Sequence, residues 1–145
     1  MLARAFFPEE LGRYGGAWWQ PGTFVCRDQG ILTGTAMERG YLESGSWEGV
    51  LNTPITRLDM AQMLYRLLAA LEVELPDAQT QETAQRAVGD WEAIPEGYRQ
   101  AVSVCYALGL LNGQADGTFG GSNCMNRAQG CTVIVRMADY LAAQA

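Results

Sequence analysis

Two arginines occupy matching places in two similar segments of the chain. Residues 55–68 align without gaps with residues 125–138 at an offset of 70 (127 − 57), so that Arg57 falls on Arg127. Each arginine follows a residue suited to start a helix. The free N–H groups at a helix start favour anions, and a guanidinium donates two parallel hydrogen bonds to a carboxylate. The pattern predicts an anion site at each arginine, with a structural ion pair to a nearby carboxylate as the alternative.

Catalytic chemistry has little support in the composition. The chain contains no histidine, which excludes Ser-His-Asp and Cys-His catalysis and every histidine-containing metal site within it. Several carboxylates are scattered along the chain: Glu9, Glu10, Glu38, Glu43, Glu48, Asp90, Glu92 and Glu96. No spacing places two of them across a cleft, as glycoside hydrolysis requires. We therefore expect a non-enzymatic protein with no catalytic residue, no cofactor and no bound metal.

The cysteines give no metal or redox motif. Cys26, Cys105, Cys124 and Cys131 form no C-x-x-C pair, and zinc-ribbon spacing is absent. Free cysteine commonly behaves as a small buried apolar residue, which is the expectation for all four. A disulfide is the alternative if the protein is exported, so the redox state stays open.

Length, charge and hydropathy point to a packed globular chain. The 145 residues are 48% hydrophobic and 18% charged, and the formal net charge is −6. This proportion of hydrophobic to charged residues is typical of a folded chain and not of a disordered one. The net negative charge makes a nucleic-acid partner unexpected. No segment reaches the roughly 18 apolar residues of a membrane span, and no signal peptide is visible at the start.

Both arginine-bearing segments are predicted to be helices. Thr56 lies three residues before Asp59, and Asn126 lies three before Gln129, as in variants of the capping box. Apolar residues then follow helical spacing and predict two buried stripes. The stripes are Met60, Met63, Leu64, Leu67, Leu68 and Leu71 in one helix, and Cys131, Ile134, Val135, Ala138 and Leu141 in the other.

A second pair of similar segments lies upstream. Residues 19–34 align with 98–113 at an offset of 79 (113 − 34), which pairs Cys26 with Cys105 and Gly30 with Gly109. Each segment predicts a helix that ends at a left-handed glycine, Gly30 or Gly109. Pro95 suits the first turn of its helix, and Pro21 either does the same or shortens the earlier helix.

The two pairs together predict a duplicated helix–loop–helix unit. The first repeat covers residues 1–75 and carries an insertion of nine residues within about 35–54, where we expect an ordered excursion. Residues 76–89 form a linker that can hold a short helix, and 90–145 form the second repeat. We expect an all-α fold with short extended loop segments, in which the two repeats pack on each other as one compact domain.

The order of these motifs resembles the S-layer homology repeat. The best match runs from Trp91 to Tyr140, and its motifs are Gly109-Leu-Leu-Asn-Gly113, Asp116-Gly-Thr-Phe119 and Met125-Asn-Arg-Ala-Gln129. Ile55-Thr-Arg-Leu-Asp59 in the first repeat is close to the family's Ile-Thr-Arg-Ala-Glu pattern.

The resemblance implies a secreted, non-catalytic module at the cell surface of a bacterium. Such modules bind secondary cell-wall polysaccharide, an anionic and often pyruvylated glycan, on behalf of a fused surface protein. The ligand-binding residues would be Arg57, Arg127, Trp19, Tyr98, Gly34, Gly113 and Asp116. Trp47 is a second candidate for stacking on a sugar face. The alternative function is a structural or protein–protein interaction module that a homo-oligomer or a partner completes.

Overall fold

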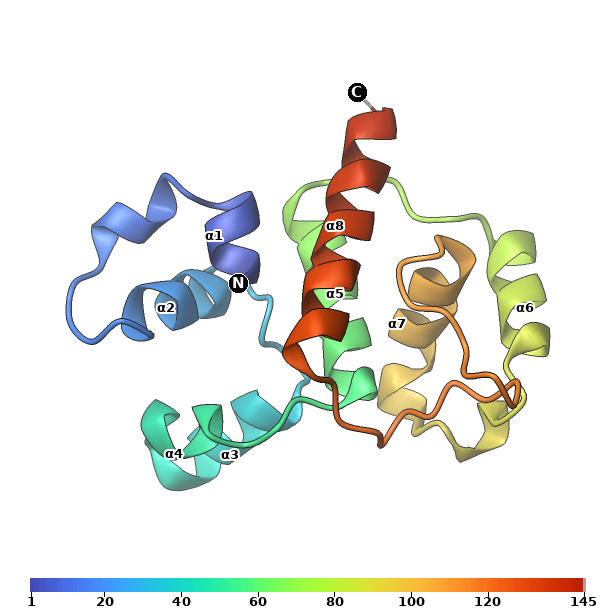
Figure 1. Ribbon diagram of the computed structural model, residues 1–145, viewed down its shortest axis with the longest axis horizontal. Helices are drawn as coiled ribbons and strands as arrows, with labels where there is room; N and C mark the ends of the chain where they lie inside the picture. Colours follow the sequence, from blue (N-terminus) through green and yellow to red (C-terminus); the bar gives the residue numbers. More distant parts are fainter. Residues whose placement is uncertain (145) are drawn as a thin grey trace.

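The computed structural model describes residues 1–144, which form an all-α protein, as predicted (Figure 1). The α-helices are α1 (Leu2–Phe6), α2 (Gln20–Asp28), α3 (Ala36–Ser44), α4 (Trp47–Leu51), α5 (Arg57–Ala70), α6 (Ala78–Ala87), α7 (Glu96–Ala107) and α8 (Arg127–Gln144), with 3-10 turns η1 (Glu10–Arg13) and η2 (Trp91–Ala93). Over these residues the extended backbone makes one isolated antiparallel bridge, between Thr56 and Cys124. No helix of residues 1–144 is long and apolar enough to cross a membrane.

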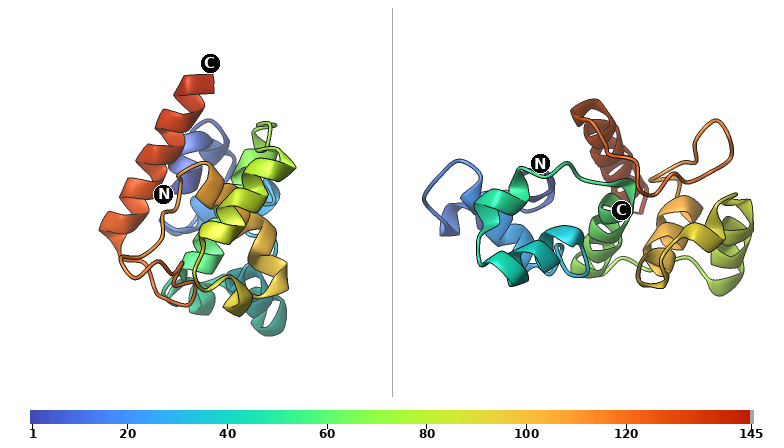
Figure 2. Two further views of the ribbon diagram at one scale, coloured as in Figure 1. Left: turned by 90° about the vertical axis from the view of Figure 1, so that its right-hand side faces the viewer. Right: turned by 90° about the horizontal axis from the view of Figure 1, so that it is seen from below.

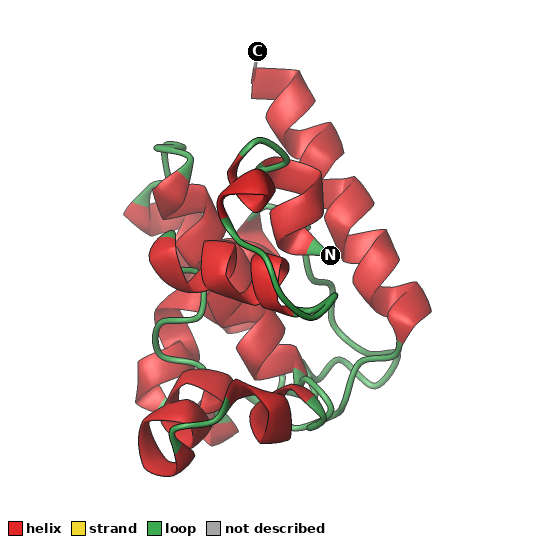
Figure 3. Ribbon diagram, turned by 90° about the vertical axis from the view of Figure 1, so that its left-hand side faces the viewer, coloured by secondary structure: helices red, strands yellow, loops and turns green. Residues whose placement is uncertain are grey.

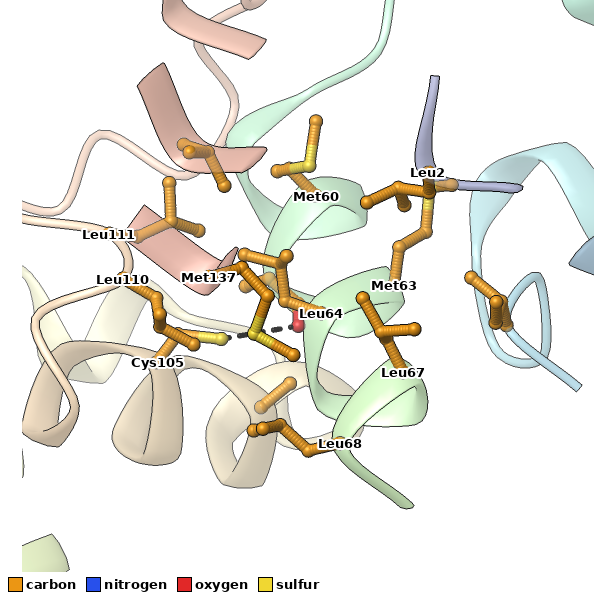
Figure 4. Close-up of a cluster of buried hydrophobic side chains, with 14 of the residues drawn as sticks. Leu2, Met60, Met63, Leu64, Leu67, Leu68, Cys105, Leu110, Leu111 and Met137 are labelled. Atoms are coloured by element: carbon orange, nitrogen blue, oxygen red, sulfur yellow. Dashed lines mark hydrogen bonds between the residues drawn. The ribbon is translucent and has the colours of Figure 1, made fainter. Parts of the chain in front are cut away.

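Helix α5 runs through the centre of the molecule. Figures 1 and 2 show α1 to α4 on one side of it and α6 and α7 on the other, and α8 lies in front of it in Figure 1. Leu64, Leu67 and Leu68 of α5 are fully buried. Figure 4 shows Met63 of α5 beside Leu2 of α1, while Leu64 lies on the side of Cys105 of α7. The central position explains why α5 is apolar over most of its circumference.

The predicted helix starts are confirmed. The Thr56 hydroxyl accepts from the Asp59 backbone N–H at 3.1 Å. Asn126 and Gln129 form a reciprocal box, in which each side-chain oxygen accepts from the other residue's backbone N–H at 2.9 Å. Both caps satisfy N–H groups that have no partner inside the helix.

The predicted glycine ends of α2 and α7 are also confirmed. Gly30 has φ +70° and Gly109 has φ +67°. The next residue donates back into the helix in both cases, from Ile31 to the Cys26 carbonyl and from Leu110 to the Cys105 carbonyl, at 2.8 and 2.9 Å. This is the Schellman arrangement, and it turns Ile31 and Leu110 into the core.

The segments outside the four matched helices are ordered (Figure 3). Residues 35–54 fold into α3 and α4, where the Trp47 ring stacks on Tyr41 with centroids 4.1 Å apart. Residues 76–89 contain α6, whose N-terminus is capped by Asp77. Pro21 lies in the first turn of α2, whereas Pro95 is the N-cap of α7 and not a residue of its first turn.

Two predictions about buried residues are wrong. Helix α8 buries Gly130, Val133 and Met137, and of the predicted stripe only Ile134 and Leu141 pack against the core. Cys131, Val135 and Ala138 are exposed, Val135 by 58%. Cys124 is exposed as well, since it lies in the bridge to Thr56 on the surface. Cys26 and Cys105 are buried as predicted, and all four thiols are free.

Candidate functional site

Arg57, the first residue of α5, is buried. Its side chain is 8% exposed, its Nε donates to the Phe119 carbonyl at 2.8 Å, and a terminal nitrogen donates to the Asn112 carbonyl at 2.5 Å. The guanidinium also lies over the Phe119 ring, 4.9 Å from its centroid. Burial and the nearby Arg136 lower the pKa of Arg57, and Asp90 opposes this shift. Within residues 1–144 the Arg57 guanidinium therefore pairs with main-chain carbonyls and not with a carboxylate.

The loop that leads into α8 wraps around the start of α5. The Arg57 and Leu58 N–H groups donate to the carbonyls of Asn123 and Gly121, both at 3.0 Å, and the Met125 N–H donates to the Ile55 carbonyl at 2.9 Å. The first N–H groups of α5 are thereby satisfied by residues more than 60 positions later in the chain. The α5 start is therefore closed to a ligand by the chain itself.

Asp90 holds the same loop from the other side. Its two carboxylate oxygens accept from the Phe119 and Gly120 N–H groups at 2.6 and 3.1 Å. The Gly89 N–H donates to the Gly117 carbonyl at 2.9 Å. A Cβ at position 89 would lie 2.9 Å from that carbonyl oxygen, which explains the glycine. Asp90 is thus a loop-positioning residue and not half of a catalytic carboxylate pair.

Tyr98 joins the two halves of the chain. Its hydroxyl donates to Asp59 of α5 at 2.9 Å and accepts from Arg39 of α3, also at 2.9 Å. The pKa of Tyr98 is raised, mainly by burial and also by the hydrogen bond to Asp59, with Arg39 acting in the opposite direction. Asp59 also accepts from the Ala36 N–H at 2.8 Å, so one buried carboxylate ties α3, α5 and α7 together.

The remaining predicted loop residues have structural contacts. Gly34 has φ +81°, donates its N–H to Glu38 at 2.7 Å and accepts from Arg39 through its carbonyl. Gly113 is packed so closely that a Cβ there would lie 3.2 Å from the Thr118 carbonyl oxygen. Asp116 is exposed and accepts from the Thr118 N–H and hydroxyl at 3.0 and 2.7 Å, which shapes the turn. Within residues 1–144 no cluster of ligating side chains fits a metal ion.

Arg127 differs from Arg57 although the two residues align. It is exposed at the start of α8, and none of its contacts to residues 1–144 is a hydrogen bond or an ion pair. The N-terminal turn of α8 contributes its own partial positive charge at the same place. Arg127 is therefore the predicted anion-binding residue that stays available to a ligand.

Trp19, aligned with Tyr98, lines a cavity of about 580 Å³ between α1, α2, α5 and α8. Trp18, beside it, is 82% exposed. Gly130, three residues after Arg127 and on the same face of α8, lines the cavity as well. Trp47 does not reach this surface, because its ring is buried against Tyr41, so it cannot serve as a sugar platform.

Residues 89–129 match the family model of the S-layer homology domain. This segment carries an S-layer homology repeat. It runs from the Gly89 turn through α7 and the loop to the first turn of α8, and it includes Tyr98, Gly113, Asp116 and Arg127. S-layer homology domains are non-catalytic modules that mediate attachment to the bacterial cell wall. No curated protein and no solved structure matches the chain.

Several residues of the site escaped sequence reasoning. Asn112 and Phe119 act through their main-chain carbonyls. Every residue type has such a carbonyl, so the sequence gives no sign of this role. Arg136 acts on Arg57 across a gap of 79 residues (136 − 57). Asp90 had a usable signal, since it is the second residue of the matched segment and directly follows Gly89, where a side chain would clash.

Proposed function

We propose that this chain is a non-catalytic anchoring module that binds an anionic polysaccharide of the bacterial cell envelope through the start of α8. The observation that carries the proposal is the exposed, unpaired guanidinium of Arg127 on a segment of S-layer homology type. Its aligned counterpart Arg57 is closed off by the chain, so one binding position remains of the two that the sequence offers.

The geometry around Arg127 suits a carboxylated sugar. The guanidinium and the N-terminal turn of α8 favour an anion at the same point. Trp18 and Trp19 supply flat apolar faces for a sugar ring across the cavity mouth. A pyruvylated cell-wall glycan has both features, an acidic group and an apolar ring face. The two-repeat organisation is part of this proposal, with α2–α5 and α7–α8 as the paired helices.

Binding to purified cell-wall sacculi tests the proposal. The wild-type chain should sediment with the sacculi, and Arg127→Ala should reduce the bound fraction about tenfold, as expected for one lost charge-assisted contact. Arg86→Ala is the matched control, since Arg86 is an exposed arginine on α6. Equal binding of the Arg127 and Arg86 variants, or no sedimentation of the wild type, would refute the proposal. Arg57→Ala is unsuitable as a binding test because it also removes the hydrogen bonds to the Phe119 and Asn112 carbonyls.

One observation favours a second candidate, self-association through α8. Val135 is 58% exposed on that helix, two turns beyond the unpaired Arg127. A second copy that covers this face would complete the repeat arrangement. Sedimentation equilibrium decides the point: a dimer that Val135→Glu dissociates supports self-association, whereas a monomer for the wild type eliminates it.

A further inference from the structure

The cavity beside Gly130 is a concave space that is partly open to solvent. Its volume of about 580 Å³ lies within the range of ligand pockets in proteins. The walls come from six helices, α1, α2, α3, α4, α5 and α8, and from the segments before α2, α3 and α5. Met60 and Met63 of α5 both line the cavity, and Figure 4 shows Met63 reaching Leu2 of α1. A concave space lined by six helices suits a small ligand better than a flat partner surface.

Gly130 of α8 lies beside empty space. The residue is buried, yet a Cβ built on it meets no atom within 4 Å. A buried glycine on a packed helix face normally has neighbours at contact distance, because protein interiors are close-packed. The aligned position in α5 carries Met60. The smaller residue in α8 leaves room for a ligand.

The walls are almost wholly apolar, with one charged side chain. Leu2, Trp19, Met37, Met63 and Ile134 dominate the lining. Methionines adapt their shape readily and suit flexible apolar ligands. Arg4 of α1 is the single charged side chain among the lining residues, and no carboxylate lines the cavity.

Arg4 is free to pair with a ligand. It makes no hydrogen bond or ion pair to any residue from 1 to 144, and it is exposed at the edge of the cavity. An apolar space with the Arg4 cation at its edge is complementary to a molecule with an apolar body and a negatively charged group. We propose that the cavity binds a single-chain carboxylate amphiphile, with its hydrocarbon chain among Met37, Met63 and Ile134 and its carboxylate at Arg4.

Titration calorimetry with sodium dodecanoate below its micelle concentration tests this site. The wild type should bind one molecule per chain. Gly130→Leu should weaken binding at least tenfold by filling the space. Gly97→Leu on α7 is the matched control, since a Cβ there also meets nothing within 4 Å but faces solvent. Arg4→Gln should weaken binding about tenfold, and Arg86→Gln should leave it unchanged.

The charge and the source of the ligand are tested with further probes. Dodecyltrimethylammonium, of the same chain length and opposite charge, should bind at least tenfold more weakly than dodecanoate. Absence of saturable dodecanoate binding, equal binding by Gly130→Leu, or equal binding of the cationic probe would overturn the proposal. Binding to phosphatidylglycerol vesicles without binding to free dodecanoate would also overturn it. So would a dimer that Gly130→Leu dissociates, because the cavity would then hold a second copy.

These outcomes are separable from those of the glycan proposal. Arg127→Ala should leave dodecanoate binding unchanged, and Arg4→Gln should leave sedimentation with sacculi unchanged.

Discussion

The Arg57 guanidinium donates to the main-chain carbonyl of Phe119 at 2.8 Å and lies over the ring of the same residue. The Arg57 side chain therefore contacts both the backbone and the side chain of a residue 62 positions later in the sequence (119 − 57). Phe119 is fully buried, so the pair fastens the loop before α8 to the start of α5. This contact gives Arg57 a structural role through a main-chain carbonyl and an aromatic ring, partners that the sequence pattern did not predict.

The two aligned arginines should differ sharply in their effect on stability. Arg57→Ala removes the buried guanidinium and leaves the Phe119 and Asn112 carbonyls without their hydrogen-bond donor. This change should lower the free energy of unfolding by about 3 kcal/mol. Arg127→Ala should change it by less than about 0.5 kcal/mol, because the side chain is exposed and unpaired. Urea denaturation of both variants measures the difference. Similar losses of stability in the two variants would contradict a structural role for Arg57 in holding the loop before α8.

The Tyr98 hydroxyl should contribute measurably to folding. Tyr98→Phe leaves the Asp59 carboxylate and the Arg39 guanidinium without their shared partner, at a cost of about 1–2 kcal/mol. Tyr140→Phe on α8 is the control, since the Tyr140 hydroxyl makes no hydrogen bond within residues 1–144. Thermal melts compare the two variants. A Tyr98→Phe protein as stable as Tyr140→Phe would show that the network adds nothing.

The four cysteines should divide into two reactive and two protected thiols. Cys124 and Cys131 are exposed, whereas burial raises the pKa of both Cys26 and Cys105. Cys105 also donates to the Ala61 carbonyl at 3.4 Å. Because the thiolate is the reactive form, iodoacetamide should label two sites in the native protein and four in urea. Peptide mass mapping identifies them, and rapid native labelling of Cys105 would contradict the packing of α7 on α5.

The Asp116 turn should open at low pH. Hydrogen bonds from the Thr118 hydroxyl and N–H lower the pKa of Asp116 below its ordinary value of about 3.9. The ionised carboxylate therefore stabilises the turn when the pH is above the ordinary pKa. This contribution is lost as the pH falls through the lower pKa of the folded protein. An NMR titration should show the Thr118 amide shifting together with the Asp116 carboxyl carbon. The Thr118 shift should vanish in Asp116→Asn; if it persists, another group controls the turn.

Local features of this fold could be predicted because they depend on neighbours in sequence. The Thr56 and Asn126 caps and the glycine ends at Gly30 and Gly109 each need only a few consecutive residues. The all-α class follows from the same local signals, and the S-layer homology resemblance holds for residues 89–129. The apolar face of α8 could not be predicted in the same way. Gly130 is buried and Val135 exposed only because of how the helix rests on α5.

The sequence by itself determined that two arginines begin two similar helices, since capping and periodicity are written into adjacent residues. Only the tertiary structure decided that they have different roles. The loop before α8 folds back over the start of α5, so its main-chain carbonyls accept hydrogen bonds from the guanidinium of Arg57. No segment of residues 1–144 forms such hydrogen bonds to Arg127, which therefore remains open to a ligand. The physical reason is that a hydrogen-bond donor is satisfied by whichever acceptor the chain brings within reach, and that choice is made by long-range packing.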